Sequence, residues 1–203
     1  MVGTLQTAAE VAEIVLKDRI FYEHSGGGVT VSGGEPLMQA EFTYSLLSIL
    51  RTEGIHTVLQ TCGQGSSAWL SKIAAVTDLI LFDYKESDDG LHKNWTGVSQ
   101  DQILANLELL AVEGVKVVLR CPIIPDLNDH SDHFAGIAKI AARMPNIEHV
   151  ELLPYHNYGL EKAMQVGVSQ RKNLRVPSHE EVLTWRDAVL HAGYDNVLIS
   201  SVS

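Results

Sequence analysis

Two residues of opposite charge lie two positions apart at the end of an apolar run of the sequence. The run LILFDYK contains Asp83 and Lys85, and residues i and i+2 of an extended backbone point to the same side. A carboxylate and an ammonium on one side, with Arg120 at the end of another apolar run, could bind a ligand that carries both an ammonium and a carboxylate, such as an amino-acid moiety. A structural ion pair between Asp83 and Lys85 explains the spacing equally well.

Paired glycines follow another short apolar run, in the segment SGGGVTVSGGEPLMQ. Gly33 and Gly34 have no Cβ, so a ligand could lie directly against their backbone carbonyl and amide groups. A tight turn before Pro36 would require the same residues, and a glycine pair by itself does not decide between the two. Gly26–Gly28, ahead of the run, are expected to form a plain loop.

The elements that position these residues are predicted by periodicity. Six short apolar runs, rich in β-branched residues, indicate strands, and they are continuous rather than alternating, as is typical of strands covered on both faces. Helical patterns separate them, so we expect stacked βαβ units, a parallel sheet or barrel, and a single domain over residues 1–203. The runs are VTVSGG, HTVLQT, LILFDYK, VKVVLRCPII, HVELLPYH and NVLISSV.

Six helices are predicted around and between those strands. Capping boxes indicate three of their starts, because a Ser or Thr is followed three residues later by Glu or Gln. The first helix precedes every predicted strand, whereas a parallel β/α array normally begins with a strand, so we expect a preceding strand to be missing from this sequence. The capping pairs are Thr7 with Glu10, Ser99 with Gln102, and Ser178 with Glu181.

The carboxyl ends of parallel strands are the places where such folds bind ligands. Polar and ionisable residues follow five of the predicted strands, so we expect them to share one rim. In chain order they are Ser32-Gly33-Gly34-Glu35, Gln60-Thr61-Cys62-Gly63, Asp83-Tyr84-Lys85, Arg120-Cys121-Pro122 and Pro154-Tyr155-His156.

Composition argues against several classes of protein. The net charge of −10, with no offsetting basic cluster, argues against nucleic acid as a partner, and no apolar run is long enough to cross a membrane. The first residues lack the features of a secretory signal, and Cys62 and Cys121 do not make a disulfide framework, so a reduced cytoplasmic protein is expected. Four further residues show no spacing typical of a metal site: His24, His56, His149 and His191.

Four segments, in order along nearly the whole chain, resemble the activating enzymes of glycyl radical enzymes, of the pyruvate formate-lyase activating enzyme type. That family belongs to the radical S-adenosylmethionine (radical SAM) superfamily. The resemblance implies an α/β fold, a partial (β/α)6 TIM-like barrel, with the first strand absent from this chain. The segments are GGGVTVSGGEPLMQAEF, TDLILFDYK, HKNWTGVS and HVELLPYHNYGLEK.

The resemblance also implies which residues bind S-adenosylmethionine. The glycine segment that ends in Glu35 would bind the methionine ammonium, and the pair Asp83 and Lys85 would hold that ammonium and its carboxylate. Arg120 would assist on the carboxylate, and His156 would flank the adenosine part. The full set is Ser32, Gly33, Gly34, Glu35, Asp83, Lys85, Arg120 and His156.

The sequence departs from the family pattern in two places. The cluster-binding motif C-x3-C-x2-C is absent, so we expect this sequence to be an N-terminally truncated form that holds no [4Fe–4S] cluster and has no catalytic residue of its own. Gln60 stands where family members often have an acidic residue, which would weaken one polar contact and any cation bound there.

The function implied by the resemblance is that of a radical SAM activase. The intact protein would use a reduced [4Fe–4S] cluster and S-adenosylmethionine to make a 5′-deoxyadenosyl radical, which takes a hydrogen atom from a glycine of a partner enzyme such as pyruvate formate-lyase. Flavodoxin or ferredoxin would donate the electron, and this chain alone would be inactive. Alternatives are an activase for a diol dehydratase, a choline lyase or an arylacetate decarboxylase, and a cluster-free barrel relative that acts only as a binding module.

Overall fold

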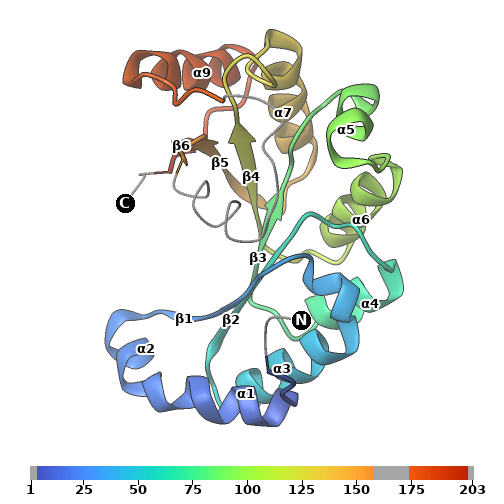
Figure 1. Ribbon diagram of the computed structural model, residues 1–203, viewed down its shortest axis with the longest axis vertical. Coiled ribbons are helices and arrows are strands. Elements are labelled where there is room, and N and C mark those ends of the chain that lie inside the picture. The colour runs from blue at the N-terminus through green and yellow to red at the C-terminus, as the bar shows by residue number, and fades with distance from the viewer. Residues whose placement is uncertain (1–3, 158–173, 201–203) are drawn as a thin grey trace. The chain divides into compact units, whose positions relative to one another are not determined.

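The computed structural model describes residues 4–157 and 174–200 of the chain. Strands alternate with helices along it (Figure 1), and all six predicted strands are present. The strands are β1 (Gly28–Val31), β2 (His56–Thr61), β3 (Leu79–Asp83), β4 (Val117–Ile123), β5 (Ile147–Pro154) and β6 (Val197–Ile199).

Helices occupy the segments around and between the strands. The six predicted helices are confirmed, whereas periodicity does not predict α2 and α5, because these short helices contain at most one buried side chain each. No described helix is both long and apolar enough to span a membrane. The helices are α1 (Ala8–Val15), η1 (Leu16–Asp18), α2 (Arg19–Ser25), η2 (Pro36–Gln39), α3 (Ala40–Thr52), α4 (Ser67–Ala74), α5 (Asp89–Thr96), α6 (Asp101–Val112), α7 (Ser131–Arg143) and α9 (His179–His191).

The six strands form one sheet in the order β1-β2-β3-β4-β5-β6. The registered pairs β1–β2, β2–β3 and β5–β6 are parallel. β3 and β4 also run the same way, because Ile80 N donates to Lys116 O and Tyr84 N donates to Arg120 O, and these partners advance together along both strands. The predicted α/β fold with a parallel sheet is therefore confirmed.

Two compact units make up the chain. The first comprises residues 1–83 and 100–118, which contain β1, β2 and β3 with helices α1 to α4 and α6. The second comprises residues 84–99 and 119–203, which contain α5, most of β4, α7, β5, α9 and β6. The single domain expected for residues 1–203 stays a prediction.

In the first unit, α1 and α3 cover one face of β1 (Figure 1). Ala12 of α1, Val29 of β1, and Leu46 and Leu50 of α3 form a buried apolar cluster together with Ile55. Leu50 is fully buried, and burial of one such side chain contributes about 2 kcal/mol to folding. This cluster orients β1 so that its other face is left for polar residues.

Within the described part of the chain, the strands of the first unit are fully buried on one face and only partly buried on the other. In β2, Leu59 and Thr61 are buried, whereas Val58 and Gln60 beside them are half-buried. The prediction of coverage on both faces is therefore wrong for this unit. The apolar runs are continuous because the second face also carries apolar residues, such as Val58, that keep partial exposure.

Two of the three predicted capping boxes are confirmed, at Thr7 and at Ser178. The one predicted at Ser99 is wrong, because α6 begins one residue later, with Gln100 as its N-cap and no side-chain capping bond. The hydroxyl of Ser99 instead donates to Asp89 Oδ1 of α5 at 3.0 Å. The serine therefore stabilises the start of α5.

Candidate functional site

Three strands of the first unit end in polar residues that share one face. Gln60 of β2 is the register partner of Leu81 of β3, so the alternation of side chains puts Gln60 and Asp83 on the same face. The same alternation puts Ser32, one residue beyond β1, on that face. This is the half-buried face, opposite the one that α1 and α3 cover.

Hydrogen bonds join these three side chains. Ser32 Oγ donates to Gln60 Oε1 at 3.3 Å, and Gln60 Nε2 donates to Asp83 Oδ2 at 3.3 Å. The structure thus connects Ser32 and Asp83, two of the residues predicted to bind a ligand. The connecting residue is Gln60, which the sequence analysis notes only because family members often have an acid at this position. The Asp83 carboxylate is half-buried, where a charge interacts more strongly with an opposite charge than it does in bulk water.

Glu35 fixes the segment that contains the paired glycines. Its Oε1 accepts hydrogen bonds from Leu37 N (3.0 Å) and Thr61 Oγ1 (2.6 Å), and its Oε2 accepts one from Cys62 N (2.9 Å). The carboxylate therefore caps η2 and binds the end of β2 at the same time. Most of its capacity to accept hydrogen bonds is used within the first unit.

The paired glycines present bare backbone to open space. Gly33 has a φ of +100°, in the region that favours glycine. A Cβ built on Gly33 or on Gly34 would meet no atom within 4 Å, so packing does not require glycine at either position. The conformation of Gly33 and the accessible backbone beside Ser32 fit a role in binding a ligand.

The loop after β2 is held by a buried asparagine. Asn106 of α6 donates from Nδ2 to Gly63 O (2.7 Å) and to Gly65 O (3.0 Å). Gly63 has a φ of +77°, and a Cβ there would lie 2.4 Å from Phe82 Cζ, so this position requires glycine both for its conformation and for its space. The loop that follows Gln60 and Thr61 is consequently held in place by α6 and by Phe82.

In the second unit, Lys85 lies just beyond the end of β3. Its side chain is half-buried, and among residues 4–157 and 174–200 no acidic side chain forms an ion pair with its ammonium. Its carbonyl oxygen accepts a hydrogen bond from Asn128 Nδ2 at 2.8 Å. A half-buried lysine of this kind is suited to binding an anionic ligand.

Arg120 lies on β4 in the same unit. Its Nε donates to Glu151 Oε2 of β5 at 3.1 Å, and both side chains are half-buried. Because a guanidinium has five N–H donors, this ion pair orients the group and leaves donors on its other edge for a carboxylate.

His156 lies in a different part of the second unit. It is exposed, and it lines a cavity of about 400 Å³ between the ends of β5 and β6 and the start of α9. The lining of the cavity is mainly apolar, with a few polar side chains. Its lining includes Pro154, His156, His179, Val182, Ile199 and Ser200.

Beside Lys85 in the sequence is a buried acid, Glu86, which lies close to two histidines, His130 and His133. The sequence patterns do not predict a role for any of the three. The fully buried Glu86 accepts from Ser87 N (2.6 Å) and lies 3.2 Å from His130 Nε2. His133, also fully buried, has its Nδ1 2.9 Å from Ser87 Oγ and 3.7 Å from Glu86 Oε1. Burial lowers the pKa of His133 to about 4, an effect that outweighs the opposing effect of Glu86.

A family model described as the radical SAM superfamily matches residues 3–136, which is more than half of the chain. This chain belongs to the radical SAM superfamily. The part of the chain that the structure describes contains no group of three or more His, Cys, Asp or Glu residues that could hold a metal ion.

Curated relatives of this radical SAM chain are activating enzymes of glycyl radical enzymes. The chain is 38% identical over 170 residues to the choline trimethylamine-lyase activating enzyme of Oleidesulfovibrio alaskensis, with 82% of this chain and 55% of that protein covered. It is 39% identical over 160 residues to the pyruvate formate-lyase-activating enzyme of Clostridium pasteurianum, with 79% and 67% covered. The family resemblance inferred from the four segments is thereby confirmed.

A solved structure supports the same family and fold. A domain of pyruvate-formate lyase-activating enzyme from Bacteroides vulgatus matches with a TM-score of 0.72 at 26% identity, covering 86% of this chain and 99% of that one. This radical SAM chain spans little more than half the length of several curated relatives that it matches.

Proposed function

We propose that the full-length protein is a radical SAM activase that generates a glycyl radical on a partner enzyme. The observation that carries the proposal is the Asp83 carboxylate, held by Gln60 on the half-buried face of the first unit together with Ser32. The curated relatives, which are named as activating enzymes of this kind, support it.

The first unit offers acceptors for the ammonium of S-adenosylmethionine. An ammonium has three donors, and it is met by the Asp83 carboxylate, by the backbone carbonyl groups of Gly33 and Gly34, and by the free lone pairs of Ser32 Oγ. We assign Glu35 the role of shaping the glycine segment, because its carboxylate already accepts three hydrogen bonds.

The second unit offers donors for a carboxylate such as the one that S-adenosylmethionine carries. The ammonium of Lys85 and the free edge of the Arg120 guanidinium are the two groups suited to this. We assign His156, at its cavity, to the adenosine part. An ammonium and a carboxylate are the two charged groups of an α-amino-acid end, so each set of residues by itself fits one charged group of S-adenosylmethionine.

When bound, S-adenosylmethionine and a reduced [4Fe–4S] cluster supply a carbon radical that removes a hydrogen atom from a glycine. The residues of this chain bind and orient the charged end of the cofactor. Cys62 and Cys121 are the two cysteines of the sequence, fewer than a cubane needs. We therefore propose that the cluster ligands lie outside residues 1–203.

The partner that we propose is a glycyl radical enzyme, such as pyruvate formate-lyase, in the cytoplasm, with flavodoxin or ferredoxin as the electron donor. The curated relatives are named for several different glycyl radical enzymes, including a choline lyase. An activase for one of these other enzymes is therefore the alternative. A cluster-free binding module would bind the same ligand, and it is distinguished by testing whether the full-length protein, loaded with its cluster, cleaves S-adenosylmethionine.

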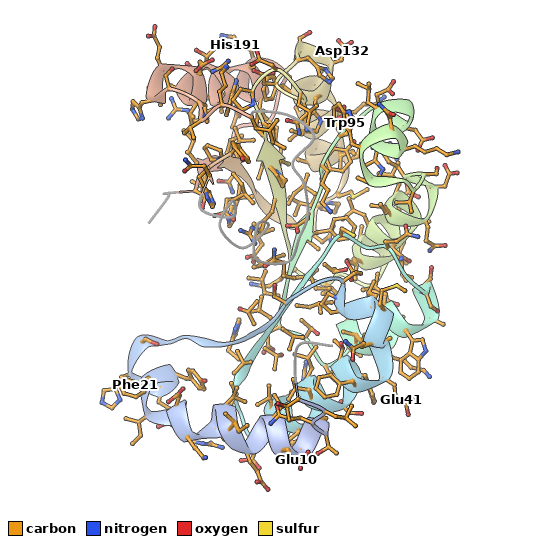
Figure 2. All side chains as sticks on the ribbon, viewed as in Figure 1. Glu10, Phe21, Glu41, Trp95, Asp132 and His191 are labelled. Carbon is orange, nitrogen blue, oxygen red and sulfur yellow. The ribbon has the colours of Figure 1, made fainter. Side chains whose placement is uncertain are left out.

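The test is calorimetric titration of the 203-residue chain with S-adenosylmethionine. Asp83→Asn keeps the shape of the side chain but removes its charge, so the affinity should fall about tenfold or more, the size expected for a charge-assisted hydrogen bond. Asp132→Asn is the matched control, because Asp132 is an exposed acid at the start of α7 (Figure 2) and is not among the residues assigned to the ligand. Equal affinities of the wild type and Asp83→Asn, or no binding by the wild type at millimolar ligand, would overturn the proposal.

A further inference from the structure

The loop between β4 and α7 holds the backbone of Lys85. Asn128 in this loop is 3% exposed, and its Nδ2 donates both to Lys85 O and to Pro122 O at 2.8 Å. Its Oδ1 accepts from Ile124 N at 2.7 Å. Both amide hydrogens and the amide oxygen are thus used on backbone groups, so this side chain acts as a clamp.

Asn128 binds the backbone just beyond the point where the hydrogen bonds of the sheet end. β3 ends at Asp83, and Tyr84 N still donates to Arg120 O of β4 at 2.7 Å. Lys85 lies one residue further, and its carbonyl is bound by the Asn128 side chain instead of by a strand. Because the backbone is held at Tyr84 N and again at Lys85 O, the direction in which the Lys85 side chain leaves the backbone is restricted.

The same amide also reaches the segment that carries Arg120. Pro122, whose carbonyl accepts the second hydrogen bond, follows Arg120 by two residues on β4. One buried side chain therefore binds the backbone at Lys85 and close to Arg120. Removing its two donors would leave two partly buried carbonyl groups without that partner and would loosen both segments.

A second contact from the same loop supports the clamp. His130 Nε2 lies 3.2 Å from Oε2 of the buried Glu86, the residue that follows Lys85. Glu86 also accepts from Asp88 N at 3.1 Å, which closes the turn after Lys85. The chain on the C-terminal side of Lys85 is thus held by the loop at two successive residues.

We propose that Asn128 is a positioning residue for the carboxylate-binding pair Lys85 and Arg120. It touches no ligand and acts through the backbone of the two segments that carry these cations. The inference rests on the proposed function, since it takes the ligand's carboxylate to be bound by that pair. A purely structural asparagine would lower stability without changing which part of the ligand is recognised.

Titration with two ligands distinguishes a positioning role of Asn128 from a purely structural one. S-adenosylmethionine carries the carboxylate, and decarboxylated S-adenosylmethionine keeps the ammonium, the sulfonium and the adenosine but lacks that group. Asn128→Ala should lower the affinity for S-adenosylmethionine about tenfold, the size of one misplaced charge-assisted hydrogen bond, and leave the affinity for the decarboxylated ligand within twofold. In a Lys85→Ala, Arg120→Ala background the same change should lower neither affinity further, because non-additivity marks residues that act through one another.

Asn106→Ala is the matched control. Asn106 is buried and also donates from Nδ2 to two backbone carbonyls, those of Gly63 and Gly65, but it does so in the first unit. It should lower the melting temperature by an amount similar to that of Asn128→Ala without changing the ratio of the two affinities. If Asn128→Ala does not fold, Asn128→Ser is titrated at low temperature in its place.

The outcomes distinguish this inference from the proposed function. If Asn128 variants lower both affinities equally, or lower neither, the positioning role is wrong, whereas the proposed function stands as long as Asp83→Asn weakens both ligands. If the wild type binds neither ligand, the proposed function fails and takes this inference with it.

Discussion

The side-chain amide of Gln60 donates a hydrogen bond to the carboxylate of Asp83 at 3.3 Å. The same amide accepts one from Ser32 Oγ, so a single neutral residue connects the ends of β1 and β3. An acid at position 60 would bring a second negative charge to hydrogen-bond distance from Asp83, and one of the two would then favour its protonated form. Gln60 instead orients the Asp83 carboxylate without adding a second negative charge.

Gln60→Met should weaken the binding of S-adenosylmethionine. Methionine has nearly the same length and volume but neither donates nor accepts a strong hydrogen bond, so Asp83 would lose its orienting partner. One such hydrogen bond contributes about 1 kcal/mol, so we expect the dissociation constant to rise about fivefold in calorimetric titration.

Gln102→Met is the control for that substitution. Gln102 of α6 lies in the same unit, and its Nε2 also makes two hydrogen bonds, to Ser67 Oγ and to Asn106 Oδ1. It should lower the urea midpoint slightly and leave the dissociation constant unchanged. A Gln60→Met protein that binds as tightly as the wild type would show that Gln60 only stabilises the sheet.

Periodicity was sufficient for the strands and for part of the site. Asp83 stands at the end of β3 with its side chain on the half-buried face, as the alternation of an extended backbone requires. Asn128 could not be found in this way, because its partner is a backbone carbonyl 43 residues earlier in the chain, and any residue type supplies a carbonyl. The number of buried faces was predicted wrongly, because the sequence of an apolar run does not show whether a residue such as Val58 is fully or only half buried.

Anaerobic reconstitution of the 203-residue chain with iron and sulfide should leave no [4Fe–4S] cluster on it. Its two cysteines, Cys62 and Cys121, are fewer than the thiolates that a cubane requires. Iron and acid-labile sulfide should be far below four of each per chain after desalting, without the broad visible absorption of a cluster. Stoichiometric iron and sulfide that persist in a Cys62→Ser, Cys121→Ser double variant would reveal ligands of another kind.

Gly63→Ala should destabilise the first unit far more than Gly54→Ala does. Both glycines have a positive φ, +77° and +75°, so alanine is strained at either position and costs about 1 kcal/mol there. At Gly63 the new Cβ would also lie 2.4 Å from Phe82 Cζ, whereas at Gly54 it would meet no atom within 4 Å. The added overpacking should bring the total at Gly63 to about 3 kcal/mol.

Urea unfolding at one temperature measures both glycine variants. Gly54→Ala shares the backbone strain, so the difference between the two midpoints isolates the contact with Phe82. A Phe82→Leu change in the Gly63→Ala background should recover part of the loss, because a leucine leaves more space beside Gly63. Equal midpoints for the two alanine variants would mean that the loop after β2 shifts freely away from β3.

The buried His133 should make the second unit sensitive to acid. Burial lowers its pKa from the usual 6.5 to about 4 in the folded protein. Between these two values the unfolded chain binds a proton that the folded chain does not, so the associated stability is fully present above pH 6.5 and is lost as the pH falls through about 4. The shift corresponds to about 3 kcal/mol at most, over that window.

His133→Asn, which cannot take up a proton in this range, should flatten the fall in urea midpoint between pH 6.5 and pH 4.5. The other groups that face His133 are Glu86, His130 and Tyr84, and these remain in the variant. His191→Asn is the matched control, because His191 is exposed at the end of α9 (Figure 2) and should leave the acid slope as it is in the wild type. An acid slope that is equally steep in His133→Asn would show that the acid sensitivity does not originate at His133.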